Sequence, residues 1–246
     1  MKKFVLLAFA AAASISLSVT TSLAIADDHS EGGPYYAFYH LQVTNPAAVV
    51  GAMDKFWASE CGKQYPADVA LLEEGFNGSN PATHFIINTF QSSADQEKAG
   101  EIMRSCPAAL EFLQTLNASG AQATTQYMGV APIDKNDWTQ DSVFSNFQII
   151  VEPQNQETYA AAYASMMEKV AKDVDLRSYG LGAVYFGRDQ FTHWVWTGAS
   201  SIQELTSISE QLLAHKAFAE FNQEVGSMRT VVNTAQNIVL KGYNRQ

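Results

Sequence analysis

The sequence is similar to itself at a displacement of 109 residues. Between residues 83 and 130, ten of the 48 positions carry the same residue as the position 109 further along. Unrelated sequences of ordinary composition would agree at about 6% of positions, or about three of these. The matches include Thr83 with Thr192, His84 with His193 and Phe112 with Phe221. We therefore interpret the chain as a tandem duplication of one structural unit.

Both halves show the same order of strand-like alternation and helical spacing. In the first half we predict strand 35–43, helix 46–60, strands 67–76 and 83–90, a helical stretch 92–117 broken near Pro107, and strand 121–130. In the second half we predict strand 143–151, helix 156–171, strands 176–186 and 191–197, helix 201–225 and strand 230–240. This order is the plan of a ferredoxin-like domain. The expected fold class is thus α+β, with repeats at 34–131 and 142–242.

A four-stranded sheet that carries both helices on one face leaves its other face uncovered. The other repeat of the same chain is the nearest element that can cover this face. We therefore expect the two repeats to pack sheet to sheet as an α/β barrel within one chain. No second chain is then needed to complete the barrel, and further association through its outer surfaces is left open.

Two segments, Ser-Cys-Pro-Ala-Ala-Leu-Glu-Phe at 105–112 and Ala-His-Lys-Ala-Phe-Ala-Glu-Phe at 214–221, are similar to the start of the second helix in monooxygenase-type proteins. The chain thereby resembles the dimeric α/β-barrel superfamily, which includes antibiotic-biosynthesis and haem-degrading monooxygenases, muconolactone isomerases and duplicated chlorite dismutases. The resemblance implies an enzyme of monooxygenase or isomerase type that handles a small apolar or aromatic molecule. The alternative is a non-catalytic protein that binds a ligand or a metal.

Strand alternation sorts the polar side chains, on the assumption that the more apolar face of each strand lies under the helices. The barrel interior is then expected to hold His40, His84 and His193, together with Asn146 and Gln148 as candidate ligand-binding residues. Three imidazoles that meet at one point are candidate ligands of a metal ion, and His84 and His193 are also candidate acid–base residues. The alternative is a hydrogen-bonded polar core.

Under the second helical layer, the same assumption predicts a cleft for a flat aromatic ligand. Its predicted ligand-binding walls are Trp194, Trp196, Phe147, Tyr159 and Tyr163, and His215 on the helix above is a third catalytic candidate. Haem is an alternative occupant that the resemblance implies. The sequence departs from the haem-degrading pattern in the phase of His215 and in the lack of a matching helix tryptophan. Ordinary core packing is the remaining alternative.

Residues 1–26 have the features of a secretory signal peptide, namely Lys2 and Lys3, an apolar run, and the small-x-small site that ends at Ala26. The chain is therefore expected in the periplasm or outside the cell. The remaining residues carry 13 basic and 25 acidic side chains, a balance that argues against nucleic-acid binding. No later apolar run is long enough for a membrane span.

Cys61 and Cys106 are the only cysteines. An oxidising compartment and an even count favour a disulfide between them over free thiols. In a continuous helix from residue 92, Cys106 would lie about 20 Å from the helix start, too far from the end of the first helix. A disulfide therefore requires a break in the helix near residue 105.

Overall fold

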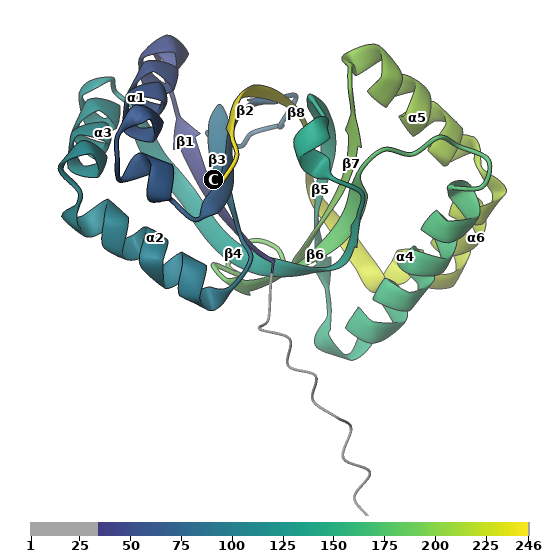
Figure 1. The fold of residues 1–246 in the computed structure, drawn as a ribbon. Coiled ribbons are helices and arrows are strands. Elements are labelled where there is room, and N and C mark those ends of the chain that lie inside the picture. Colours follow the sequence, from purple (N-terminus) through teal and green to yellow (C-terminus); the bar gives the residue numbers. More distant parts are fainter. Residues whose placement is uncertain (1–33, 246) are drawn as a thin grey trace, which may run out of the picture. The chain divides into compact units, whose positions relative to one another are not determined.

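The computed structural model describes residues 34–245, which fold into a closed eight-stranded barrel with helices on its outside (Figure 1). The predicted signal peptide lies outside the described residues. The strands are β1 (Tyr35–Gln42), β2 (Ala67–Gly75), β3 (His84–Phe90), β4 (Gln122–Lys135), β5 (Val143–Val151), β6 (Tyr179–Phe186), β7 (His193–Ala199) and β8 (Arg229–Tyr243). The helices are α1 (Pro46–Ala58), α2 (Ser93–Ser105), α3 (Pro107–Ala118), α4 (Gln156–Val170), α5 (Ile202–Ala214) and α6 (Lys216–Val225).

The strand order around the barrel is β1-β3-β2-β8-β5-β7-β6-β4. All neighbouring strands are antiparallel. Each half therefore has the order last-first-third-second, as the ferredoxin-like plan requires. The halves join at two seams, β2 with β8 and β4 with β6. The predicted α+β barrel within one chain is confirmed.

The helices cover the outside of the barrel in two groups, α1 to α3 over the first half and α4 to α6 over the second (Figure 1). Side chains that cap the first turn fix where several of these helices begin. Asn45 accepts a hydrogen bond from the Ala48 N–H at the start of α1, and Ser92 and Ser201 do the same for α2 and α5. None of the helices in the described residues is long and apolar enough to cross a membrane.

Both predicted long helices are broken in two. In the first half the break lies at Cys106, just before Pro107, as predicted, because proline cannot continue the hydrogen bonding of the preceding turn. In the second half the predicted helix 201–225 is wrong at His215, where α5 has ended and α6 begins. The His215 ring accepts the Ala217 N–H and so starts a new helix without a proline.

Cys61 and Cys106 form a disulfide, with their Cα atoms 6.5 Å apart. The predicted pairing and the helix break that it requires are both present. The bond ties the end of α1 to the junction of α2 and α3. Closing a loop of 45 residues contributes about 3 to 4 kcal/mol to stability by restricting the unfolded chain.

In both halves, a threonine just before the third strand of the half binds the chain at the end of the first strand in the same way. Thr83 Oγ1 accepts the Val43 N–H at 2.9 Å and lies 2.8 Å from Nδ1 of His84. Thr192 Oγ1 accepts the Val151 N–H at 2.8 Å and lies 2.8 Å from Nδ1 of His193. This likeness supports an origin by tandem duplication, which stays a prediction.

The barrel interior is packed with aromatic side chains, for which β6 makes room. Gly180 and Gly182 lie directly opposite Trp196 and Trp194 of β7, and a Cβ atom on Gly182 would stand 2.1 Å from the Trp194 indole. A side chain at either glycine would displace a buried ring. These glycines therefore fix the two indoles inside the barrel.

We predict that Gly182→Ala lowers the free energy of unfolding by about 1 to 3 kcal/mol, because the new methyl group overpacks the Trp194 ring. Gly51→Ala is the matched control. Gly51 lies in α1 with no atom near its would-be Cβ, so this change is expected to be neutral or stabilising. Urea unfolding of both variants measures the difference, and equal stability would contradict the packing described.

Candidate functional site

His40 points into the barrel, as predicted, among aromatic rings. Its imidazole lies 5.2 Å from the Phe85 ring and 5.4 Å from the Tyr127 ring, measured between centroids. Its Nδ1 lies 3.0 Å from Oε1 of Glu74, and both side chains are buried. Asn146 and Gln148 are also buried on the barrel side of β5. The sorting of faces on β1 and β5 is thus correct.

On β3 and β7 the predicted sorting of faces is wrong. His84 lies opposite Leu41, and His193 lies opposite Ile149; both partners belong to the cores under the helices. Trp194 and Trp196, which we expected under the helices, point into the barrel. The assumption that the more apolar face lies under the helices fails because a closed barrel excludes water from its interior as well.

The three candidate metal-binding histidines therefore do not meet. His40 lies on the inner face, whereas His84 and His193 lie on the outer face of different halves. Within residues 34–245, no three His, Cys, Asp or Glu side chains are arranged to hold a metal ion. His84 and His193 each bond to the preceding threonine instead. The structure does not bring these side chains together for the predicted chemistry.

A cleft does lie under the second helical layer, but it is small. Phe147, Tyr159 and Tyr163 line it as predicted, and its volume is about 150 Å³. Arg229 crosses this second-half cleft. Its guanidinium donates to the Tyr159 hydroxyl at 2.9 Å and to Asn222 Oδ1 at 2.8 Å, and lies 5.0 Å above the Phe221 ring. The arginine thus occupies space that a larger ligand would need.

The second-half cleft does not fit haem, and His215, which we expected above the ligand, does not line it. Nδ1 of His215 accepts the Ala217 N–H, and its Nε2 lies 3.1 Å from Oδ2 of Asp173. Neither ring nitrogen is therefore free to bind iron. A volume of about 150 Å³ is also below the range of about 300 to 1,000 Å³ that is usual for small-molecule sites.

A much larger cleft lies under the helices of the first half, which the sequence did not predict. Its volume is about 770 Å³. The floor comes from β1, β3 and the start of β4, and the walls from α2, α3 and the end of α1. The aromatic residues that line this first-half cleft are Tyr39, Trp57, Tyr65, Phe90 and Phe112, and the polar ones include Asn88, Gln96, Glu97, Arg104 and Asn117.

Two polar side chains that line the first-half cleft form a buried pair. The Tyr65 hydroxyl donates to Asn88 Oδ1 at 3.0 Å. Burial raises the pKa of the Tyr65 phenol, so that it stays protonated and remains a donor. Because Asn88 accepts this bond through its oxygen, its NH₂ group remains to donate. The pair sets one fixed polar point in a mostly apolar cavity.

The two clefts differ because of side chains at the start of the last strand of each half. Ala123 lies opposite Leu41 on β1, and Val231 lies opposite Ile149 on β5, so these residues correspond. Two positions earlier, Ala121 corresponds to Arg229. The first half thus has alanines where the second has arginine and valine. At the displacement of 109 residues found in the sequence, Arg229 aligns with Gly120 instead, so this difference emerges only from the strand register of the structure.

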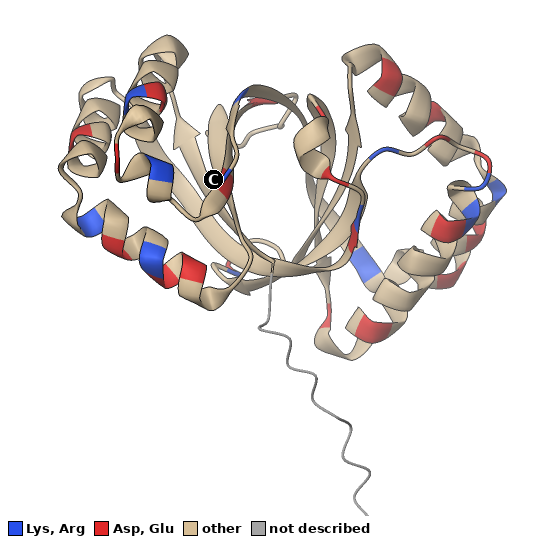
Figure 2. Cartoon of the chain, viewed as in Figure 1, with Lys and Arg blue, Asp and Glu red and all other residues tan. Residues whose placement is uncertain are grey.

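Charged side chains gather on the helices and loops, and the strands carry few (Figure 2). Two charged side chains, those of Asp141 and Glu74, are buried, and each has a partner of opposite charge or a histidine beside it. Asp141, at the start of the second half, is 5% exposed and pairs with Arg177. Glu74 pairs with His40. Arg104, which lines the first-half cleft, is exposed at its rim.

No family model matches the sequence, and no curated protein matches it. Solved structures do match the fold. Two are proteins described as "putative monooxygenase": one from Lactobacillus acidophilus has TM-score 0.60, 12% identity and coverage of 87% of this chain and 97% of that chain. The other, from Fusobacterium nucleatum, has TM-score 0.58, 14% identity and coverage of 85% and 93%. An anthrone oxidase-like protein has TM-score 0.57, 13% identity and coverage of 87% and 94%. These likenesses establish a monooxygenase-like barrel fold.

We predict that the imidazole of His193 stays neutral well below pH 6.5. Burial lowers its pKa to about 4, and the charge of Arg188 adds to this. Because the unfolded chain takes up the proton near pH 6.5, this residue lowers the free energy of unfolding as the pH falls from 6.5 towards 4. The loss is on the order of 2 to 4 kcal/mol over this range.

The pKa is measured directly by NMR titration of the His193 ring. Urea unfolding of the His193→Asn variant between pH 7 and 4 checks the linkage, since the variant should lose stability less steeply than the wild type. A His193 ring that titrates near pH 6.5 would show that the imidazole is not desolvated as described.

Proposed function

We propose that this protein is a monooxygenase-like enzyme that binds a flat aromatic molecule with a phenol or ketone oxygen in the first-half cleft and oxidises it with dioxygen. The observation that carries the proposal is the cleft itself. Its volume of about 770 Å³ falls in the range of small-molecule sites, and its aromatic walls with few polar groups are typical of them. The second-half cleft, crossed by Arg229, lacks this room.

The shape and lining of the cleft favour a flat substrate. Trp57, Tyr65 and Phe112 supply ring faces and edges, and aromatic rings stack on one another with a preferred offset geometry. The Tyr65–Asn88 pair offers a fixed hydrogen-bonding point for a phenol or ketone oxygen. One solved structure of the same fold is an anthrone oxidase-like protein, and an anthrone is a molecule of this class.

The proposed reaction balances without an external reductant. A methylene group between two aromatic rings is oxidised as R₂CH₂ + O₂ → R₂C=O + H₂O, so that one oxygen atom enters the carbonyl and the other leaves as water. The substrate supplies all the electrons. Loss of a proton from the methylene group to solvent water gives an aromatic phenolate, and the positive charge of Arg104 at the rim favours that anion.

We predict that anthrone is oxidised to anthraquinone with uptake of dioxygen. Asn88→Ala should lower kcat/KM by about tenfold to a hundredfold, because it removes the NH₂ group that donates to the substrate oxygen. Tyr65→Phe should lower it by about tenfold, because it removes the hydrogen bond that holds the Asn88 amide in place. Tyr185→Phe is a matched control. Tyr185 is exposed on β6, outside the cleft, and its loss of a hydroxyl should leave the rate unchanged.

The measurement is dioxygen consumption, corrected for the spontaneous oxidation of anthrone without protein. Equal rates in all three variants would place the reaction elsewhere. Binding of anthrone in the cleft without any dioxygen uptake would overturn the enzymatic proposal and leave a ligand-binding protein.

We also propose that the protein is exported, with residues 1–26 removed. The supporting facts are the signal-like amino terminus and the Cys61–Cys106 disulfide, since such bonds persist in oxidising compartments. When the full chain is expressed in a bacterium, the mature protein should begin at Asp27 and carry no free thiol, both measurable by mass spectrometry. An intact amino terminus in the cytosolic fraction would contradict this proposal.

A further inference from the structure

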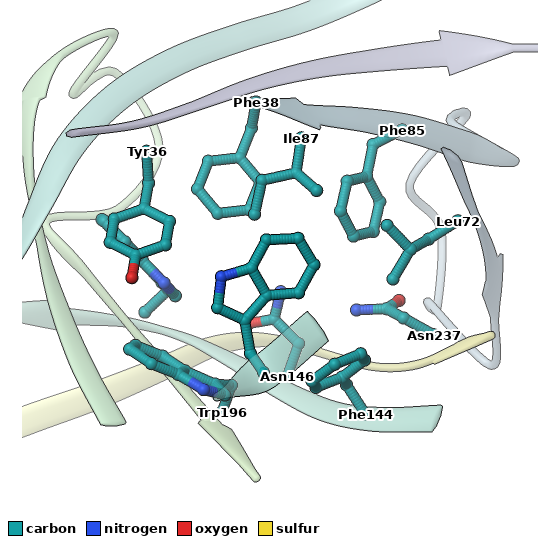
Figure 3. A pocket seen from close by; sticks show the side chains of 11 residues that line it. Tyr36, Phe38, Leu72, Phe85, Ile87, Phe144, Asn146, Trp196 and Asn237 are labelled. Carbon is teal, nitrogen blue, oxygen red and sulfur yellow. The ribbon is translucent and has the colours of Figure 1, made fainter. Parts of the chain in front are cut away.

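The inside of the barrel has little free space. Figure 3 shows Tyr36, Phe38 and Phe85 pointing into it from one side. Trp196 and Phe144 point into it from the other. These rings leave a volume of about 50 Å³, which ordered water molecules can occupy. Room for a further ligand therefore lies outside the sheet, in the second-half cleft.

The second-half cleft keeps a volume of about 150 Å³ beside the Arg229 side chain. This is too little for haem or for a tricyclic anthrone, but an apolar cavity of this volume holds benzene. Three of the lining residues, Phe147, Leu213 and Val231, are exposed, so the cleft opens to solvent on their side. It therefore has room for one six-membered aromatic ring, with a polar group at the mouth.

Arg229 is the only charged residue that lines the second-half cleft. The other lining residues are aliphatic, aromatic, methionine or hydroxyl-bearing. The guanidinium is half-buried and lies 5.0 Å above the Phe221 ring. Within residues 34–245, it forms no ion pair with a carboxylate. One positive charge thus lies in apolar surroundings without a negative charge to balance it.

Arg229 has N–H groups left for an anion. Its side chain carries five N–H donors. Two of them bond to neutral acceptors, the Tyr159 hydroxyl of α4 and Asn222 Oδ1 of α6, and these bonds hold the guanidinium in place. Water can bind the remaining donors but cannot neutralise the charge. A planar fork of such donors matches the two oxygens of a carboxylate.

The two clefts differ in charge as well as in size. The first-half cleft is lined by charges of both signs, Glu97 and Arg104. At the position of Arg229, the first half has Ala121. The lone cation is therefore a feature of the second-half cleft only, and it favours a ligand that is both smaller and negatively charged.

We propose that the second-half cleft binds a one-ring aromatic carboxylate of the size of benzoate. The ring lies among the apolar side chains, where its burial removes apolar surface from water. The carboxylate lies at the mouth and accepts charge-assisted hydrogen bonds from Arg229. This site is independent of the first-half cleft, which lies under the other group of helices.

The probe is sodium benzoate, titrated into the full protein at pH 7 and constant ionic strength. Calorimetry measures the affinity, and NMR of the methionine methyl groups identifies the cleft. Met166 and Met167 line the second-half cleft, whereas Met103 lines the first-half cleft. We expect one benzoate per chain with a Kd of about 1 mM or lower, and shifts at Met166 and Met167. Benzamide, a neutral molecule of nearly the same shape, should bind at least tenfold more weakly.

Arg229→Gln should weaken benzoate binding about tenfold to a hundredfold, because it removes the charge-assisted hydrogen bonds. Arg104→Gln is the matched control. Arg104 lines the first-half cleft and not the second, so its loss should leave the affinity for benzoate unchanged.

Ser209→Leu tests the cavity with Arg229 in place. Ser209 lines the second-half cleft from α5, and the larger side chain fills the space for the ring, so binding should weaken at least tenfold. Circular dichroism of each variant confirms folding, and Ser209→Leu tests the site even if Arg229→Gln does not fold.

Four results would overturn the proposal: no saturable binding, shifts confined to Met103, equal affinity for benzamide, or unchanged affinity in both Arg229→Gln and Ser209→Leu. The second would assign benzoate to the first-half cleft, and the third would identify a site for neutral aromatic molecules. Failure of this proposal leaves the anthrone experiment unaffected, since that experiment concerns Tyr65 and Asn88 in the first-half cleft.

Discussion

Closure of the barrel at its two seams is the constraint on which the rest of the structure depends. The β2–β8 and β4–β6 ladders join the edges of the two repeats, so neither sheet has a free edge and the interior holds little water. The interior must then be filled, and large aromatic rings fill it. The glycines of β6 face the two indoles because no side chain fits beside them.

Because aromatic side chains fill the inside, the clefts lie on the outside, between sheet and helices. The two halves share the same arrangement of elements and differ there in a few side chains. Alanines at 121 and 123 leave the first-half cleft open, whereas Arg229 and Val231 narrow the second. The disulfide holds the junction of α2 and α3 over the open cleft. One half thus has the space for a large ligand, and both halves supply the barrel that supports it.

Periodicity and the internal repeat were enough to predict the order of the elements and the barrel, and the even cysteine count with an expected oxidising compartment predicted the disulfide. They also sorted β1 and β5 correctly, where His40 and Asn146 face inwards. The faces of β3 and β7 could not be sorted by polarity, since both faces of these strands are buried. Gly180 and Gly182, opposite Trp196 and Trp194, were the better signal. The open cleft depends on side-chain volumes across elements far apart in the sequence.

Amide hydrogen exchange along the two seams, followed residue by residue by NMR, tests the closed barrel most directly. The account predicts that amides of β2 and β8 that pair across the seam, such as those near Leu72 and Val239, are as strongly protected as amides paired within one repeat. Rapid exchange along β2–β8 or β4–β6, with slow exchange elsewhere, would show two sheets with open edges and would contradict the account.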